Sequence, residues 1–113
     1  RIITILTSAL IDKPPLGASV YTANKAYLAQ LSKSWATEYS KYGITSNTIS
    51  PSFMQTGMTA QTDERILSQM TNNHPLKKLL TTNEVAEAVQ FLLKASQNLN
   101  GIDLVINAGQ NIK

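Results

Sequence analysis

A tyrosine and a lysine four positions apart are the residues of this chain whose types and spacing could do chemistry. Tyr21 and Lys25 lie in the stretch SVYTANKAYL, within a region that contains no helix-breaking residue. On a helix, residues four apart share a face, with their Cβ atoms about 5 to 6 Å apart. A free phenol ionises only near pH ~10, and a nearby cation favours the phenolate. The pair could therefore exchange a proton near neutral pH, as general acid-base catalysis requires. The alternative is a half-buried tyrosine beside a lysine whose stem lies over apolar surface.

A strand and a long helix are predicted to position this pair. RIITILTS, residues 1 to 8, is apolar and β-branched on both alternations, which predicts a strand buried on both faces. A loop rich in proline and glycine follows. Residues 20 to 42 then predict a helix, capped at its end by Gly43. We interpret its apolar stripe as core; the stripe consists of Leu28, Leu31, Trp35 and Tyr39.

The remainder of the chain continues the alternation of strands and helices. Residues 44 to 50 predict a second strand ended by Pro51, residues 63 to 70 a short helix, and residues 102 to 107 a third strand. Thr81 and Glu84 form a capping box before a helix over residues 85 to 95. Its predicted buried stripe is Val85, Ala88, Val89, Leu92 and Leu93. This order predicts one α/β domain over residues 1–113, with a parallel sheet and right-handed crossovers.

Composition argues against several classes of function. The formal net charge is +3 over 113 residues, but the lysines are scattered rather than clustered, so we expect no nucleic-acid partner. There is no cysteine and only one histidine, His74, which argues against a metal site and a Ser-His-Asp hydrolase. No apolar run is long enough to cross a membrane and no signal-peptide pattern opens the chain. We therefore expect a cytoplasmic protein.

Three motifs in order resemble those of the short-chain dehydrogenase/reductase family. YTANK carries the family's Y-x-x-x-K pattern, and Ser8 in ILTS precedes Tyr21 by thirteen positions, the family's usual separation. NTISPSFMQT, from Asn47 to Thr56, is similar to the family's N-x-x-x-P-G-x-x-x-T segment. The resemblance covers essentially the whole chain, and its details are most similar to the three-oxoacyl-carrier-protein reductase branch.

The resemblance implies a fold that is the C-terminal part of a Rossmann-type doubly wound parallel sheet. The three strands would be strands 5, 6 and 7 of the family order 3-2-1-4-5-6-7, with Asn107 to Gly109 at the exit of the last one. The family's glycine-rich turn, T-G-x-x-x-G-x-G, cradles the pyrophosphate at a helix N-terminus and does not occur here. We therefore expect the N-terminal nucleotide-binding half to be absent, and this fragment alone to be inactive and a poor binder of dinucleotide.

The resemblance also implies a role for each motif residue. Tyr21 would be the general acid or base at the substrate oxygen, Lys25 would favour its phenolate and hydrogen-bond the nicotinamide ribose, and Ser8 would polarise the carbonyl. The cofactor would be NAD or NADP, and the substrate a small carbonyl compound or alcohol. The residues implied to meet the cofactor are Tyr21, Lys25, Pro51, Ser52, the backbone around Met54, and Thr56. Ser8 and Thr56 have an alternative as hydroxyls that satisfy local backbone.

One departure keeps a second function open. The family's Pro-Gly is Pro51-Ser52 here, and glycine permits a closer ligand approach than serine. The alternative to an enzyme is a catalytically inactive, family-like binding or regulatory module. Residues 54 to 80 occupy the family's variable substrate cover. The long helix suits a homodimer or homotetramer of the full-length protein, and we expect no membrane partner.

Overall fold

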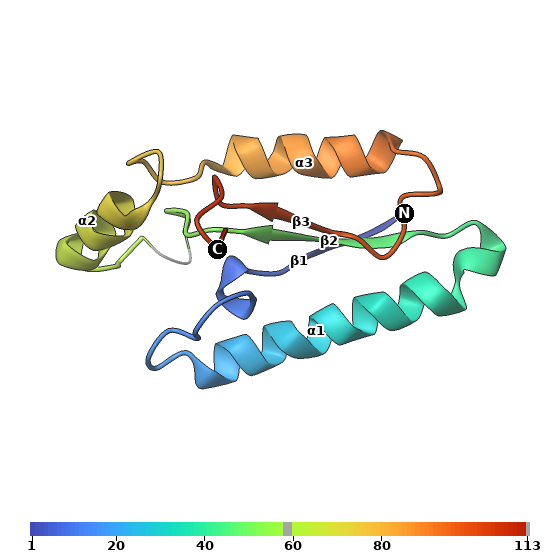
Figure 1. Cartoon of the computed structure of the whole chain (residues 1–113), viewed down its shortest axis with the longest axis horizontal. Helices are drawn as coiled ribbons and strands as arrows, with labels where there is room; N and C mark the ends of the chain where they lie inside the picture. The colour runs from blue at the N-terminus through green and yellow to red at the C-terminus, as the bar shows by residue number, and fades with distance from the viewer. Residues whose placement is uncertain (58–59, 113) are drawn as a thin grey trace.

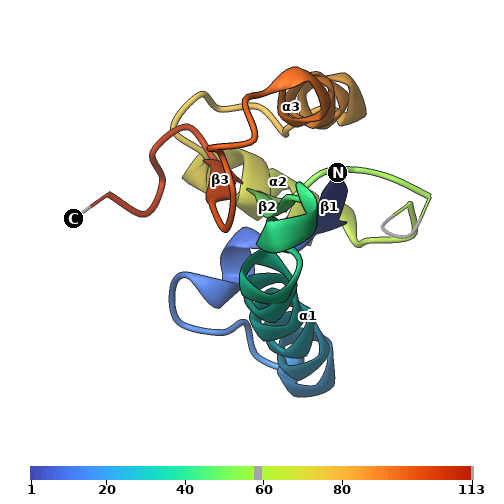
Figure 2. The ribbon, with the colours of Figure 1, turned by 90° about the vertical axis from the view of Figure 1, so that its right-hand side faces the viewer.

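Three parallel strands form one sheet in a computed structural model that describes residues 1–57 and 60–112. The strands β1 (Ile2–Ile5), β2 (Ser46–Pro51) and β3 (Asp103–Ile106) lie in the order β1-β2-β3. Helix α1 (Ser19–Glu38) covers one face and α3 (Thr82–Lys94) the other (Figures 1 and 2). Helix α2 (Glu64–Asn73) lies beyond the carboxyl ends of the strands (Figure 1). The predicted α/β fold, with three adjacent parallel strands, is confirmed.

The central strand β2 is buried along its whole length. Its side chains alternate between the two faces, as strand geometry requires. Toward α1 it presents hydroxyls, and the Ser46 Oγ lies 2.8 Å from the Ser32 Oγ of that helix. Toward α3 it presents Ile49, which is fully buried. The polar and apolar faces of this one strand decide how each helix packs.

The hydrophobic core lies between the sheet and α3. Its buried members are Ile49, Leu80, Val85 and Leu92. The prediction for this helix is wrong at Leu93, which is 52% exposed, whereas Leu92 is 1% exposed. One position along an α-helix is a rotation of about 100°, which turns Leu93 away from the sheet. The capping box of Thr81 and Glu84 is confirmed.

Helix α1 packs on the sheet with small residues rather than with its large apolar ones. Its buried residues are Thr22, Ser32 and Ala36. The residues predicted as core are only half-buried; they are Leu28, Leu31, Trp35 and Tyr39. The reason is the hydroxyl-bearing face of β2, against which short side chains fit. The helix also ends at Glu38, and a 3₁₀ turn, η2 (Ser40–Tyr42), precedes Gly43, whose φ of 73° confirms the left-handed cap.

Strand β1 is shorter and more exposed than its sequence predicts. It ends at Ile5, and Ser8 opens a 3₁₀ turn, η1 (Ser8–Leu10), instead of continuing the strand. Residues 2 to 4 are half-buried and Ile5 is 36% exposed, so the prediction of a strand buried on both faces is wrong here. In the described part of the chain β1 is an edge strand, and it is β2 that is covered on both faces.

Helix α2 runs three residues past its predicted end, to Asn73, and His74 is its C-cap. Its N-terminus is capped by Asp63. The Asp63 carboxylate accepts a 2.7 Å hydrogen bond from the Arg65 N–H, as an N-cap residue does. The predicted loop therefore begins after Asn73 rather than at Thr71. Over residues 1–57 and 60–112, no helix is long and apolar enough to cross a membrane.

Candidate functional site

The residues with predicted roles gather where the strands end. The carboxyl ends of β1 and β2, the turn η1 and the first turns of α1 all lie at one end of the molecule (Figure 1). The Leu6 N–H donates a 2.7 Å hydrogen bond to the Ile49 carbonyl, which joins the ends of the first two strands. Ligands of open parallel α/β sheets bind in the crevice outside the carboxyl ends of the strands. This end of the sheet is therefore the candidate active site.

The Lys25 side chain is hydrogen-bonded to the end of the first strand. Its Nζ donates a 2.8 Å hydrogen bond to the Ile5 carbonyl oxygen, and it lies 5.9 Å from the centroid of the Tyr21 ring. Helical spacing brings the two side chains to one face, and the Ile5 carbonyl orients the ammonium. Tyr21 is 40% exposed, so its phenol is open to a ligand. The arrangement suits proton exchange between this phenol and a bound molecule.

Ser8 stands three positions beyond the carbonyl that holds Lys25. It is half-buried, and its own carbonyl accepts a 3.0 Å hydrogen bond from the Ile11 N–H. The preceding residue caps this turn, since the Thr7 hydroxyl accepts a 3.2 Å hydrogen bond from the Ala9 N–H. The Thr7 hydroxyl is thus the N-cap of this turn.

Ser52 carries an unsatisfied group at the end of β2. Its N–H donates to the Ile106 carbonyl at 2.9 Å, but its hydroxyl has no hydrogen-bond partner among the described residues. The residue is only 6% exposed. Leaving a buried polar group unpaired costs about 1 to 3 kcal/mol, so such a group calls for an explanation. A ligand at the carboxyl end of β2 would supply the missing partner.

The segment after Ser52 runs along the same edge. Met54 packs against the core cluster, and Thr56 is half-buried in a loop. Met58 and Thr59 of the predicted substrate cover lie outside the described residues. Ser8 and Lys25 thus lie at the carboxyl end of β1, which is joined to the end of β2 that Pro51 forms, and Tyr21 lies beside Lys25.

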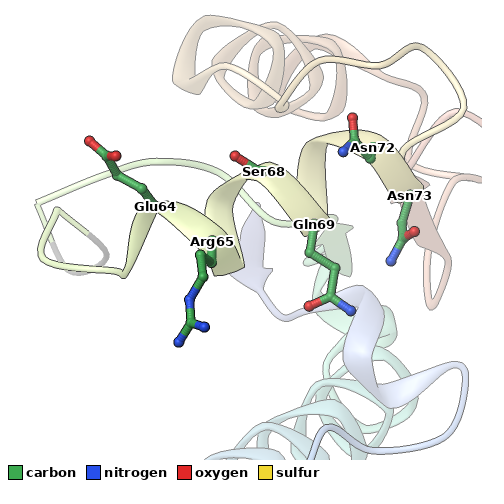
Figure 3. A pocket seen from close by; sticks show the side chains of 6 residues that line it. All are labelled: Glu64, Arg65, Ser68, Gln69, Asn72 and Asn73. Atoms are coloured by element: carbon green, nitrogen blue, oxygen red, sulfur yellow. The ribbon is translucent and has the colours of Figure 1, made fainter.

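Two other groups of polar residues do not form a comparable site. The polar side chains of α2 extend in different directions from an exposed helix (Figure 3). The buried His74 accepts a 3.1 Å hydrogen bond at Nδ1 from the Leu76 N–H, which is a structural contact at the end of α2. Within residues 1–57 and 60–112, no group of three metal-ligating side chains comes together.

One feature of the site is not predicted by the sequence. The hydrogen bond from Lys25 to Ile5 joins residues twenty positions apart, and no local pattern signals it. The buried Asn107 terminates β3, with its Oδ1 accepting a 3.1 Å hydrogen bond from the Gly109 N–H. Asn107 lies where the sequence analysis expects the exit of the last strand.

Comparison with known proteins identifies the family of this chain. A family model described as "Enoyl-(Acyl carrier protein) reductase" matches residues 1–111. The chain belongs to the short-chain dehydrogenase/reductase family. Within this family, it is similar to the three-oxoacyl-carrier-protein reductases, as the sequence motifs indicate.

Curated members of the short-chain dehydrogenase/reductase family carry related names. The chain is 32% identical to "Acetoacetyl-CoA reductase" of Synechocystis over 111 residues, which is 96% of this chain and 46% of that protein. It is 34% identical to "3-oxoacyl-(acyl-carrier-protein) reductase FabG" of Buchnera aphidicola over 110 residues, covering 96% and 44%. The chain thus spans about half the length of the curated relatives it matches. Their names differ in substrate, so they establish the family and not a substrate.

A solved structure of this family supports the fold. The crystal structure of 3-hydroxyacyl-CoA dehydrogenase type-2 from Mycobacterium avium superimposes with a TM-score of 0.84 at 29% identity. The match covers 98% of this chain and 43% of that one. The sheet and helices described above are therefore a partial Rossmann-type fold.

Proposed function

We propose that this chain is the catalytic, C-terminal part of an NAD(P)-dependent oxidoreductase that interconverts a carbonyl and a secondary alcohol. The observation that carries the proposal is the position of Lys25, hydrogen-bonded to Ile5 and 5.9 Å from the Tyr21 ring. The names of the matched relatives, which are reductases and dehydrogenases, support the same reaction class.

Each residue of the site has a task in this reaction. In carbonyl reduction the Tyr21 hydroxyl gives its proton to the substrate oxygen, and in alcohol oxidation the phenolate takes it back. The Lys25 ammonium places a positive charge 5.9 Å from the centroid of the Tyr21 ring. Its hydrogen bond to the Ile5 carbonyl keeps it in place during both directions. The Ser8 hydroxyl donates a hydrogen bond to the substrate carbonyl and polarises it.

The residues present fit a nicotinamide cofactor at the carboxyl end of β2. The buried Ser52 hydroxyl lacks a partner among the described residues, as expected of a group that meets a ligand. Tyr21 and Lys25 would hold the nicotinamide end together with Pro51, Ser52, Thr56 and the backbone around Met54. When bound, NAD or NADP carries the hydride, while the protein orients it and supplies the proton.

The same protein is proposed to act as a homodimer or homotetramer in the cytoplasm. Helix α1 supports this, because its large apolar side chains are not fully buried in this chain. Leu28 and Trp35 are half-buried, and Tyr27 is 67% exposed. Aromatic and aliphatic side chains of this kind are enriched in the buried centre of protein interfaces.

Substitution of the proposed proton donor tests the function. NADPH and NADH oxidation is measured with the full-length protein against a panel of ketones. Tyr21→Phe removes the phenolic proton and keeps the ring, so turnover should fall by roughly 10² to 10⁴-fold, the usual contribution of a general acid. Tyr42→Phe is the matched control, because Tyr42 is 67% exposed in η2 and belongs neither to the site nor to α1, and it should keep full turnover.

Two outcomes would count against this proposal. Unchanged turnover in Tyr21→Phe would exclude Tyr21 as the proton donor. Nucleotide binding without turnover on any ketone or alcohol would favour the alternative, an inactive binding or regulatory module.

A further inference from the structure

A second polar cluster lies on the face of the sheet that α1 covers. The Thr48 hydroxyl donates a 2.7 Å hydrogen bond to the Asp103 carboxylate. The Ser50 hydroxyl donates to the same carboxylate, 2.9 and 3.0 Å from its two oxygens. Thr48 is 7% exposed and Ser50 is 1% exposed, so the hydroxyls are held rigidly within the sheet. The cluster takes no part in the proposed oxidoreductase site.

These three residues line a cavity of about 370 Å³. Its apolar lining includes Leu10 of η1 and Ala26 and Ala29 of α1, and the side chains of Gln30 and Lys33 of α1 line it as well. Figure 2 shows both elements on the same side of the sheet, beneath β2 and β3. The space exists because α1 turns alanines toward this part of the sheet, where longer side chains would fill it. Ligand pockets have similar volumes, about 300 to 1,000 Å³, and similar apolar walls.

The hydrogen bonds inside the cluster leave only acceptors for a further partner. A hydroxyl has one hydrogen to donate and two lone pairs, and an ionised carboxylate only accepts. Thr48 and Ser50 each donate their hydroxyl hydrogen to Asp103. The two hydroxyl oxygens and the carboxylate therefore keep lone pairs that can accept further hydrogen bonds. An ammonium group has three N–H donors and no acceptor. Its hydrogen-bonding capacity is therefore complementary to this cluster.

The negative charge in the cavity is not balanced within the described part of the chain. Asp103 forms no ion pair with any described residue, although the Lys33 side chain lines the same cavity. Asp103 is an exposed residue at the rim of the cavity, so its carboxylate is accessible to a ligand. A hydrated metal ion would meet the carboxylate but would face apolar walls, whereas an organic cation has an apolar body that matches them. The observations therefore favour a cation with a hydrocarbon part.

We propose that this cavity binds a small organic ammonium ion, with its charged head on Asp103, Thr48 and Ser50 and its apolar body against η1 and α1. The site is separate from Tyr21, Lys25 and Ser52, so its existence does not depend on the proposed oxidoreductase activity.

Binding of benzylammonium tests the site, with benzyl alcohol as the neutral probe of the same shape. Protein comprising the whole chain is titrated with each probe, and backbone amide shifts are followed by NMR. Benzylammonium should shift the amides around Asp103 and bind at least about tenfold more tightly than the alcohol, since hydrogen bonds to charged groups are the stronger ones. Asp103→Asn should lose about tenfold in affinity for benzylammonium.

Two further variants keep the test decisive if Asp103→Asn unfolds. Ala29→Leu fills the cavity without touching the carboxylate and should abolish binding of benzylammonium. Glu87→Gln removes the same charge from an exposed position on α3, and should leave the affinity unchanged. Equal binding of both probes, or full affinity in Ala29→Leu, would overturn the proposal. Shifts at Asp103 with magnesium chloride and none with benzylammonium would assign the cluster to a metal ion and would also overturn it.

Discussion

Lys25 shows how one side chain can link two elements of a site. Its ammonium hydrogen-bonds the Ile5 carbonyl at 2.8 Å and lies over the Tyr21 ring. Ser52 shows the opposite condition, a buried hydroxyl with no partner in the described part of the chain. The first contact sets a charge beside a phenol, and the second leaves a polar group for a ligand. Both contacts are consistent with the proposed site for ligand binding and proton exchange.

A residue-scale prediction concerns the capping box of α3. The Thr81 N–H donates a 2.8 Å hydrogen bond to the Glu84 carboxylate, which, together with the Thr81 hydroxyl, lowers the pKa of Glu84 from its ordinary value of 4.5. Because the folded pKa is lowered, the ionised carboxylate stabilises the folded state above about pH 4.5. That contribution is lost as the pH falls through the lowered folded value.

Glu84→Gln should therefore unfold at a lower temperature than the parent protein at pH 7, and the difference should shrink on acidification below pH 4.5. Thermal unfolding at pH 7, 5 and 3 measures it. Glu87→Gln, one turn along the same helix and outside the capping box, is the control and should show no such trend. A difference that is constant across this pH range would contradict the assignment.

The two helices that flank the sheet pack against it by different chemistry. Helix α3 uses Val85 and Leu92 against Ile49, so its attachment to the sheet is hydrophobic. Helix α1 uses Ser32 and Ala36, and the hydroxyl contact between Ser32 and Ser46 is its buried polar link to β2. The stability of the domain should accordingly depend more on the α3 face than on the α1 face.

Truncation of two adjacent leucines tests this at the scale of the element. Leu92→Ala should lower the free energy of unfolding by about 2 to 5 kcal/mol, because it opens a cavity in the core. Leu93→Ala makes the same chemical change at a position that is 52% exposed, and should cost about 0.5 kcal/mol or less. Urea unfolding of both variants measures the difference. Equal losses would mean that α3 is rotated relative to the sheet.

At the scale of the whole molecule, the chain carries the proposed proton-transfer residues beside a three-stranded sheet. Its matched relatives are about twice as long. The pyrophosphate of a dinucleotide binds to a glycine-rich turn at a helix N-terminus, and these 113 residues contain no such turn. We therefore propose that proton transfer and phosphate binding belong to different parts of the family fold.

The 113-residue chain by itself should bind NAD(H) and NADP(H) weakly or not at all. Isothermal titration calorimetry measures this, with a full-length relative as the positive control. Micromolar affinity in the isolated chain would show that the residues around Ser52 and Lys25 hold the cofactor without a phosphate cradle, and would contradict the prediction.

Much of the fold follows from local patterns. The capping box of Thr81 and Glu84 and the left-handed Gly43 are interactions within a few residues, and both are found where the sequence predicts them. The errors occur where distant elements decide. Leu93 and the apolar residues of α1 were predicted as buried because periodicity marks a stripe but does not state which face meets the sheet. The edge position of β1 likewise depends on its neighbours in space.

The sequence by itself determined the family, the order of strands and helices, and the pairing of Tyr21 with Lys25, because each rests on residue types at short, regular spacing. Only the tertiary structure decided that Ile5 orients Lys25, that Ser52 is buried without a partner in the described chain, and that Thr48 and Ser50 converge on Asp103. The physical reason is that hydrogen bonds between separate elements depend on strand register and helix packing. Neither of these is set by the few residues on each side of a contact.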